Sequence, residues 1–404
     1  MNRLQNLISE LCPNGVEYKR LGEIGTVSRG GSFQKKDFRD VGIPCIHYGQ
    51  IYTQYGLFVD KTLKYIAEEL REKQKMAMPN DIIMAVTSEN IEDVCKCVAW
   101  LGCEAVAVSG HTAVIHHNQN AKYLTYYFHT EMFATQKRKL AHGTKVIEVT
   151  PDKLADIVLP VPPLPVQQEI VRILDAFTEL TDKLTAELTA RQKQYEYYRD
   201  LLLSFGSNTS SQNVQVERER ERGGGQIRWL TLSAISSLFR GEYITKQGTQ
   251  KGTVPVILGG QEPAYYIDQS NHDGEIVVIA RSGVSAGFVS YWNEPVFITD
   301  GFGYEAKDSL VTPKYLYYIL KSREKELNAM KRGAGVPHIS GEALGKKEFP
   351  IPSIPEQNHI VSILDRFDAL CNDLTSGLPA EMEARRKQYE YYRDKLLTFK
   401  ELEA

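Results

Sequence analysis

Apolar positions in the middle of the chain recur in steps of four and three residues. The stripe runs through Ile170, Leu174, Phe177, Thr181, Leu184, Leu188, Arg191, Tyr195, Tyr198, Leu202 and Phe205. Such steps keep side chains on one face of an α-helix and are typical of a coiled-coil seam, here interrupted by Thr181 and Arg191. We therefore predict one helix of some 40 residues, about 60 Å long at about 1.5 Å per residue.

A second stripe of the same kind lies near the C-terminal end of the sequence. It runs through Ile360, Leu364, Phe367 and Cys371, and then through Tyr389, Tyr392, Leu396 and Phe399. Gly377 and Pro379 lie between its two parts and weaken a helix, so we predict a break near residues 375–379. The proline-rich segments LPVPPLPVQQ and FPIPSIP precede the two helices, where we expect a strand to end and a helix to begin.

The two stripes belong to an internal repeat. PVQQEIVRILDAF at Pro165–Phe177 returns as PEQNHIVSILDRF at Pro355–Phe367, and RQKQYEYYRDLLLSF at 191–205 returns as RRKQYEYYRDKLLTF at 385–399. Further upstream, GTKVIEVTPDKL from Gly143 aligns with GAGVPHISGEAL. Repetition on this scale indicates that a whole arm of the protein was duplicated and then diverged.

The repeat divides the chain into arms and helices. The predicted fold is α+β, with mixed α/β arms at 1–160 and 226–350, long helices at 161–205 and 351–400, and a linker at 206–225. The linker is predicted because it combines polar residues, a Glu/Arg alternation and three glycines with few apolar side chains. The Glu/Arg alternation also leaves open a frayed extension of the helix before it.

Composition places limits on the class of protein. The 404 residues are 42% hydrophobic, enough for ordinary cores, and the net charge of -3 excludes a bulk polycation, so any nucleic-acid binding requires local patches. Neither a signal peptide nor a run of 18 apolar residues is present, and the six cysteines do not resemble a secreted disulfide framework. We expect a cytoplasmic protein with free thiols.

Motifs for catalysis and cofactor binding are missing from the sequence. The one Pro-Pro pair, Pro162-Pro163, is followed by Leu rather than by the aromatic residue of an amino-methyltransferase motif. Pro151-Asp152-Lys153 has no second acid and lysine at nuclease spacing, and no GxxxxGK[ST] loop occurs. We therefore expect no catalytic residue and no bound cofactor in this chain.

A group of cysteines and histidines invites comparison with a zinc site. It contains Cys95, Cys97, Cys103, His111, His116 and His117. Its spacing differs from that of paired CxxC knuckles, and Cys95 and Cys97 are expected on one side of a strand. We favour a face of buried free thiols and predict no metal site.

The duplicated PxxPxQ...IVxxLD helix and LISELCPNGVEYKRLGEI at Leu7–Ile24 resemble the specificity subunits of type I restriction-modification systems, from about residue 5 to 400. In that family an acid usually precedes the helix glutamine, as Glu356 precedes Gln357, whereas Val166 stands there in the first copy. The resemblance implies that each arm is a target-recognition domain for one half of a bipartite site on double-stranded DNA. It further implies that the helices set the spacing of the halves and dock two methyltransferase subunits. S-adenosylmethionine, ATP and Mg²⁺ would then belong to partner subunits, which include a restriction subunit in some complexes.

Basic clusters beside glycine are the candidates for contact with DNA, because they combine cations with accessible backbone amides. In the first arm these residues are Arg29, Ser32, Gln34, Lys35, Lys36, Lys137, Arg138 and Lys145. In the second arm they are Arg240, Lys246, Arg281, Ser282, Lys331, Arg332 and His338. The loops after the apolar strands DIIMAV and EIVVIA are expected to hold base-reading side chains.

The repeated helices provide a second set of candidates, for helix packing or subunit docking. They are Gln167, Ile170, Leu174, Phe177, Tyr195, Tyr198, Gln357, Ile360, Leu364, Phe367, Tyr389 and Tyr392. Two similar helices in one chain can pack antiparallel and give the protein a pseudo-two-fold axis, which suits a two-part target. The alternative is a coiled-coil scaffold that assembles proteins without reading DNA.

Overall fold

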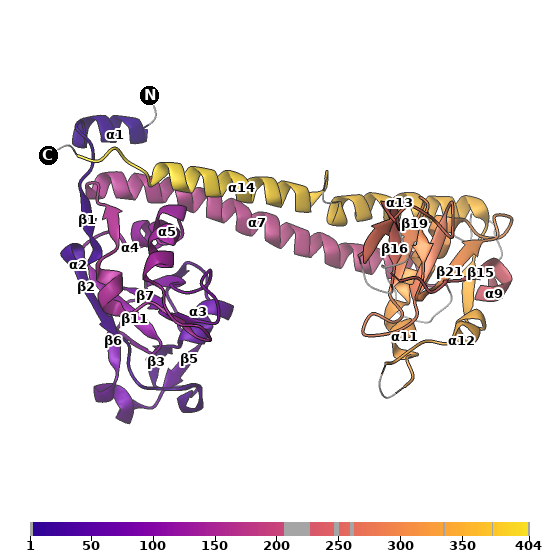
Figure 1. The fold of residues 1–404 in the computed structure, drawn as a ribbon, viewed down its shortest axis with the longest axis horizontal. Helices are drawn as coiled ribbons and strands as arrows, with labels where there is room; N and C mark the ends of the chain where they lie inside the picture. The colour runs from indigo at the N-terminus through magenta and orange to yellow at the C-terminus, as the bar shows by residue number, and fades with distance from the viewer. Residues whose placement is uncertain are drawn as a thin grey trace. The chain divides into compact units, whose positions relative to one another are not determined.

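The computed structural model describes residues 3–205, 227–245, 250–258, 262–333, 336–373 and 375–402 (Figure 1). They form two compact units: unit 1 contains Met1–Leu184 and Met382–Ala404, and unit 2 contains Thr185–Glu381. The predicted linker at 206–225 lies outside the described residues.

Unit 1 is built on two main sheets. The first has the order β2-β11-β7-β9-β4, formed by Gly25–Arg29, Thr112–His117, Ile82–Ala85, Cys97–Trp100 and Phe58–Val59. The second has the order β5-β3-β10-β6, formed by Lys64–Ile66, Ile43–Ile46, Val106–Val108 and Lys75–Ala77. Two short pairs join β1 (Tyr18–Arg20) to β13 (Val158–Pro160) and β8 (Thr87–Ser88) to β12 (Ile147–Glu148). Every residue of β7 and β9 is buried, as their unbroken apolar sequence predicts.

Unit 2 repeats this arrangement with fewer strands. One sheet has the order β15-β21-β18-β19, formed by Ser236–Arg240, Gly301–Ala306, Ile276–Ala280 and Val289–Trp292. The other has the order β17-β16-β20, formed by Tyr265–Ile267, Lys251–Ile257 and Phe297–Ile298. A separate pair joins β14 (Arg228–Thr231) to β22 (Glu348–Ile351).

The two units share one topology. Strand β3 pairs antiparallel with β5 and parallel with β10, and β16 pairs in the same two senses with β17 and β20. The antiparallel ladder of β2, β11, β7 and β9 likewise corresponds to that of β15, β21, β18 and β19. The predicted duplication of a mixed α/β arm is therefore confirmed at the level of the fold.

Short helices connect the strands in both units. Those of unit 1 are α1 (Arg3–Leu11), α2 (Leu21–Ile24), α3 (Tyr48–Thr53), α4 (Ala121–Tyr127), α5 (Glu131–Leu140) and α6 (Pro151–Ala155), with 3-10 turns at Lys35–Asp37 and Glu68–Lys73. Those of unit 2 are α9 (Leu232–Ile235), α10 (Pro313–Ser322), α11 (Glu324–Ala329) and α12 (Gly341–Gly345). Helices α4 and α10 begin alike, because Asn120 and Thr312 each accept a hydrogen bond from a backbone amide of the first turn.

The predicted long helices are present. Helix α7 spans the 40 residues Leu164–Leu203, close to the predicted length. The second helix is divided into α13 (Ile354–Asn372) and α14 (Leu378–Leu396), so the predicted break is confirmed. Gly377 is required there, because a Cβ atom would lie 2.5 Å from the carbonyl oxygen of Ala369.

Aromatic rings of the helix stripes pack in the same way within each unit. In unit 1, Phe177 of α7 stacks on Tyr392 of α14, with ring centroids 5.7 Å apart and an interplanar angle of 25°. In unit 2, Phe367 of α13 stacks on Tyr198 of α7 at the same distance and angle. Tyr389 and Tyr195 contact the same two phenylalanines. These aromatic candidates pack within the protein.

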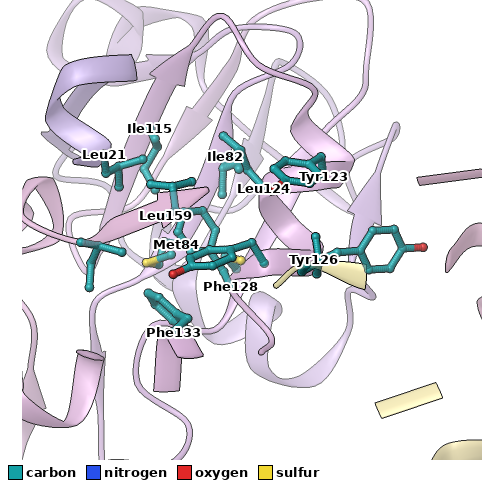
Figure 2. Packing of buried hydrophobic residues seen from close by; sticks show 14 of the residues in the cluster. Leu21, Ile82, Met84, Ile115, Tyr123, Leu124, Tyr126, Phe128, Phe133 and Leu159 are labelled. Carbon is teal, nitrogen blue, oxygen red and sulfur yellow. The ribbon is translucent and has the colours of Figure 1, made fainter. Parts of the chain in front are cut away.

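Each arm also packs on the first turns of its long helix. Figure 2 shows the core of unit 1, where Ile82 and Met84 of β7 lie among Tyr123, Leu124 and other apolar side chains. Ile170 and Leu174 of α7 belong to this core, and Ile360 and Leu364 of α13 belong to that of unit 2. All four side chains are fully buried, so they pack inside their units.

A buried glutamine fastens each long helix to its arm. In unit 1, Gln167 accepts a hydrogen bond from the backbone amide of Asn120 (3.0 Å) and donates one to the carbonyl of Pro162 (2.8 Å). In unit 2, Gln357 accepts from the amide of Thr312 (2.9 Å) and donates to the carbonyl of Pro352 (3.0 Å). Neither side chain is exposed, so both glutamines pack inside their units.

Two turns further along each long helix, an aspartate makes a second connection between the helix and its arm. Asp175 binds the ammonium of Lys122 (2.7 Å) and the hydroxyl of Tyr126 (2.8 Å). Asp365 binds Lys314 (3.2 Å) and Tyr318 (2.5 Å) in the same way. Burial and the neighbouring carboxylate raise the pKa values of both tyrosines, so their hydroxyls stay protonated as donors.

The C-terminal segment returns to the N-terminal segment within unit 1. The amide of Val16 donates to the carbonyl of Lys400 (2.8 Å), and the amide of Leu402 donates to the carbonyl of Val16 (2.9 Å). The hydroxyl of Tyr18 donates to the carbonyl of Phe399 (3.0 Å), and Leu397 is fully buried in the unit 1 core. None of the helices in the described ranges is both long and apolar enough to span a membrane.

We predict that Gln167→Ala lowers the free energy of unfolding of unit 1 by about 2 to 3 kcal/mol, because it leaves the amide of Asn120 and the buried carbonyl of Pro162 without their partner. Urea titration monitored by circular dichroism measures this change. Gln168→Ala, at the neighbouring exposed position of the same helix and unit, is the control and should change stability by less than about 0.5 kcal/mol. Equal effects of the two substitutions would contradict the anchoring role.

Candidate nucleic-acid interface

Three of the predicted segments of unit 1 come together at the end of β2. Arg29 is the last residue of β2, and its guanidinium forms an ion pair with Glu148 at 2.5 Å. Glu148 lies in β12, which pairs with β8, the start of the loop after the buried strand β7. The turn after β2, the loop at 87–95 and the basic segment around Lys145 therefore form one surface.

The basic segment of unit 1 ends in a tight hairpin. The backbones of His142 and Glu148 exchange two hydrogen bonds, of 3.0 and 2.8 Å. Gly143 has φ of +111°, and a Cβ atom there would lie 2.0 Å from the carbonyl oxygen of Val146. Glycine is therefore required by the hairpin itself, and the hairpin presents Lys145 to solvent.

Unit 2 contains the equivalent hairpin. The backbones of Arg332 and His338 exchange two hydrogen bonds of 3.0 Å, and Gly333 has φ of +118°. His338 forms a β-bridge with Ser282, which lies in the loop after the buried strand β18. The next amide, that of Ile339, donates to the carbonyl of Arg281 at 2.9 Å.

Most of the predicted DNA-contacting side chains face solvent. The exposed residues are Arg29, Ser32, Gln34, Lys35, Lys36, Arg138, Lys145, Arg240, Arg281, Arg332 and His338, and the partly exposed ones are Ser282 and Lys331. Lys246 lies outside the described residues. Exposure makes these residues available to a ligand, and their assignment to DNA stays a prediction.

The structure contradicts the prediction that Lys137 contacts DNA. It is 7% exposed, and its ammonium donates to the backbone carbonyls of Glu92 (2.6 Å) and Val94 (2.8 Å). Burial lowers its pKa from the ordinary lysine value. Its side chain holds the loop that precedes β9 and is unavailable for contact with phosphate, so Lys137 has a structural role.

Two carboxylates of this surface were missed by the sequence analysis. Glu148 holds Arg29 in unit 1, and Asp300 accepts a hydrogen bond from the hydroxyl of Ser282 in unit 2. The repeat contained a signal for the first, since Glu148 aligns with His338 and the aligned hairpins thus differ in charge. The sequence contained no signal for Asp300, because Asp300 and Ser282 follow two different strands that are distant in the sequence.

All six cysteines are free thiols. Cys95 and Cys97 are buried, as predicted, and burial raises the pKa of Cys95 to about 12. Cys95 has φ of +68° and lies in the turn before β9, so the expectation that both cysteines share one strand was wrong. Cys103 is exposed. Within the described ranges, no group of three or more His, Cys, Asp or Glu side chains could hold a metal ion.

The chain therefore contains two copies of one mixed α/β fold, each with a glycine hairpin beside a strand-end loop. The family model described as type I restriction modification DNA specificity domain matches residues 13–191 and 231–384. The chain belongs to this family.

Curated relatives agree with this assignment. The chain is 34% identical over 259 residues to the EcoR124I/EcoR124II specificity subunit of Escherichia coli, covering 58% of this chain and 60% of that one. It is 33% identical to a putative type I restriction enzyme specificity subunit of Haemophilus influenzae, covering 64% of this chain and 68% of that one. The chain thus spans about three fifths to two thirds of the length of these two relatives.

A solved structure has a similar fold. It is the S subunit of a type I restriction-modification system from M. genitalium, with a TM-score of 0.60, 16% sequence identity, and coverage of 95% of this chain and 96% of that one. A second solved chain, from work on complex assembly of a type I system, has the same score and identity, with coverage of 96% and 98%.

We predict that Lys137→Ala lowers the free energy of unfolding by about 2 kcal/mol, because two backbone carbonyls lose a charged donor. Lys139→Ala, at an exposed position of the same helix, should change stability by less than about 0.5 kcal/mol. Thermal unfolding of the two variants measures the difference. If both variants melt with the unaltered protein, Lys137 is not structural.

Proposed function

We propose that this chain reads a bipartite DNA site, with one half-site bound by each unit, and that it contributes no catalytic step. The observation that carries the proposal is the recurrence of one surface, a glycine-hairpin beside a strand-end loop, in two units of the same fold with different side chains. Equivalent frameworks with different side chains suit two unlike half-sites. Phosphate contacts by the exposed lysines and arginines would fix the orientation of each unit on the duplex.

We propose further that the long helices pair as an antiparallel coiled coil that sets the distance between the half-sites. This is supported by the ring stacking of Phe177 on Tyr392 and of Phe367 on Tyr198, which has the same geometry in both units. A rod of two helices resists bending more than a single chain segment does, so it suits a fixed spacing.

The repeated sequence KQYEYYRD supplies the surface to which we assign two methyltransferase subunits. Within it, Tyr195 and Tyr198 of α7 turn toward Phe367, whereas Tyr197 is 53% exposed. In α14, Tyr391 is 60% exposed and lies among charged residues, namely Lys387, Glu390, Asp394 and Lys395. A large exposed aromatic ring within a charged rim is typical of a protein contact.

The partners would supply the chemistry. Two copies of one surface suit two copies of one methyltransferase subunit, and S-adenosylmethionine would be bound by those subunits. A restriction subunit that uses ATP and Mg²⁺ would join the same complex. We assign the assembly to the cytoplasm, where it meets chromosomal DNA.

We predict that Arg281→Ala alters one half of the methylated motif and leaves the other half unchanged, because Arg281 belongs to one unit. The chain is expressed with its methyltransferase subunit, and methylated bases are mapped genome-wide. Arg228→Ala, on β14 and outside the candidate interface, is the control and should leave the whole motif unchanged. A complex that assembles but shifts no DNA would favour the scaffold alternative over DNA recognition.

We predict that Tyr391→Ala reduces the number of bound methyltransferase subunits from two to one, and that adding Tyr197→Ala removes the second. The reason is that each substitution removes the exposed ring from one copy of the repeated surface. Native mass spectrometry of the purified complex counts the subunits. Tyr266→Ala, which removes a ring 52% exposed on β17, is the control. Two subunits retained by the double variant would refute this docking surface.

A further inference from the structure

The guanidinium of Arg29 is held along one edge and open at its end. Its Nε donates to the carbonyl of Gly110 (3.2 Å), and its Nη2 donates to the carboxylate of Glu148 (2.5 Å). A guanidinium carries five N–H donors, and these two bonds use only the edge that faces the protein. Within the described ranges, Nη1 has no hydrogen-bond partner. The pair of donors at the end of the fork, one on Nη1 and one on Nη2, is therefore available to a ligand.

The groups that hold Arg29 are themselves fixed by backbone geometry. Arg29 pairs with Ala113 in the β2–β11 ladder. Gly30 follows at once, and a Cβ atom there would lie 2.0 Å from the carbonyl oxygen of Ser109, so the turn packs directly against the neighbouring backbone. Glu148 is fixed by its pairing with Thr87. Such support reduces the conformational entropy that Arg29 would lose on binding.

Arg138 provides the contrast within the same unit. Its Nη1 bonds to Glu131 (2.5 Å) and its Nη2 to Glu92 (3.4 Å), so acidic side chains occupy the end of the fork. The terminal donors of Arg138 are therefore already bonded to carboxylates, whereas those of Arg29 remain available to a ligand. Lys145 is exposed but carries a compact ammonium without a planar pair of donors.

Glu148 is not explained by stability or by general attraction to DNA. The Arg29 and Glu148 side chains are 49% and 28% exposed, and ion pairs this accessible contribute only about 0 to 1 kcal/mol. A carboxylate on a surface that faces phosphates also weakens nonspecific binding, because it repels them. If Glu148 increases the specificity of binding, its small contribution to stability and its repulsion of phosphates are both explained.

We infer that Glu148 is a positioning residue that directs the open end of the Arg29 guanidinium toward a guanine in the half-site read by unit 1. The two parallel donors match the O6 and N7 acceptors that guanine presents in the major groove. Without Glu148, the Arg29 side chain would be free to turn toward phosphate. This inference rests on the proposed function and adds to it the base recognised by one residue.

The second unit differs at this place. The position of Glu148 in the hairpin of unit 1 is occupied in unit 2 by His338, as the equivalent backbone bridges show. Arg240 ends β15 as Arg29 ends β2, but His338 occupies the hairpin position that corresponds to Glu148, so no carboxylate stands there. The device is therefore specific to unit 1, and substitutions of Glu148 should leave the half-site of unit 2 unaffected.

The test uses the full chain in complex with its methyltransferase subunits and the duplex that methylation mapping identifies. In that duplex, each guanine of the unit 1 half-site is replaced in turn by 7-deazaguanine, which lacks the N7 acceptor. One such replacement should weaken binding of the unaltered complex by about 10-fold. The same replacement should have no further effect on Arg29→Ala or Arg29→Lys, because neither side chain makes the bidentate contact.

Glu148→Ala separates positioning from simple charge. It should weaken binding of the specific duplex about 5-fold and strengthen binding of a scrambled duplex about 3-fold, since one repulsive charge is lost. Glu148→Gln, which keeps an acceptor for Arg29, should retain more of the specificity than Glu148→Ala. Glu10→Ala removes an exposed acid of α1 and controls for net charge; it should change neither affinity.

The outcomes distinguish this inference from the proposed function. If the complex binds no duplex preferentially, the proposed function fails. If it binds its site but no 7-deazaguanine replacement couples to Arg29, or Glu148→Ala weakens both duplexes equally, only the role of Arg29 and Glu148 is overturned. Melting temperatures equal to that of the unaltered complex exclude misfolding as the cause.

Discussion

The whole arrangement depends on one buried amide side chain at the start of each long helix. Gln167 and Gln357 are fully buried, and each joins the first turn of its helix to the backbone that begins α4 or α10. A buried amide that lost these partners would keep its desolvation cost without compensation, so the helix cannot slide or rotate without penalty. Asp175 and Asp365 make a second fixed point along the same helices. Two fixed points determine the direction in which a helix leaves its arm.

The two units divide their residues between a shared framework and individual surfaces. The ladders, the glycines of the hairpins and the glutamine anchors recur at equivalent positions, because the backbone would be strained or unsatisfied without them. The side chains on the hairpins and strand-end loops differ, as Glu148 and His338 illustrate. Divergence is tolerated there because exposed side chains of a hairpin contribute little to stability. Recognition can therefore change while the fold stays the same.

Much of the fold could be predicted because it is periodic or repeated. The stripe through Ile170 and Leu174 predicted α7, and Gly377 predicted the break before α14. The pairing of segments distant in sequence could not be predicted in the same way. The ion pair of Arg29 and Glu148 joins positions 119 residues apart, and no local pattern specifies it.

The direction in which individual side chains point also could not be predicted from the sequence. Lys137 lies in a basic cluster, but the helix turns it inward toward carbonyls that only the folded loop brings near. Tyr197 and Tyr198 are adjacent in sequence, and only the packed helix shows that Tyr198 stacks on Phe367 while its neighbour faces solvent. A repeat identifies which residues matter, whereas the folded structure decides which way they point.

The pairing of Val16 with residues 400–402 has a consequence for biosynthesis. A ribosome releases the arm of unit 1 early, but residues 382–402, including the buried Leu397, emerge only after all of unit 2. Until these residues emerge, part of the apolar surface of the first arm stays exposed, and exposed apolar surface promotes aggregation. A chain truncated before Leu397 would leave that surface permanently open, and it would be recognised as incomplete by chaperones and proteases.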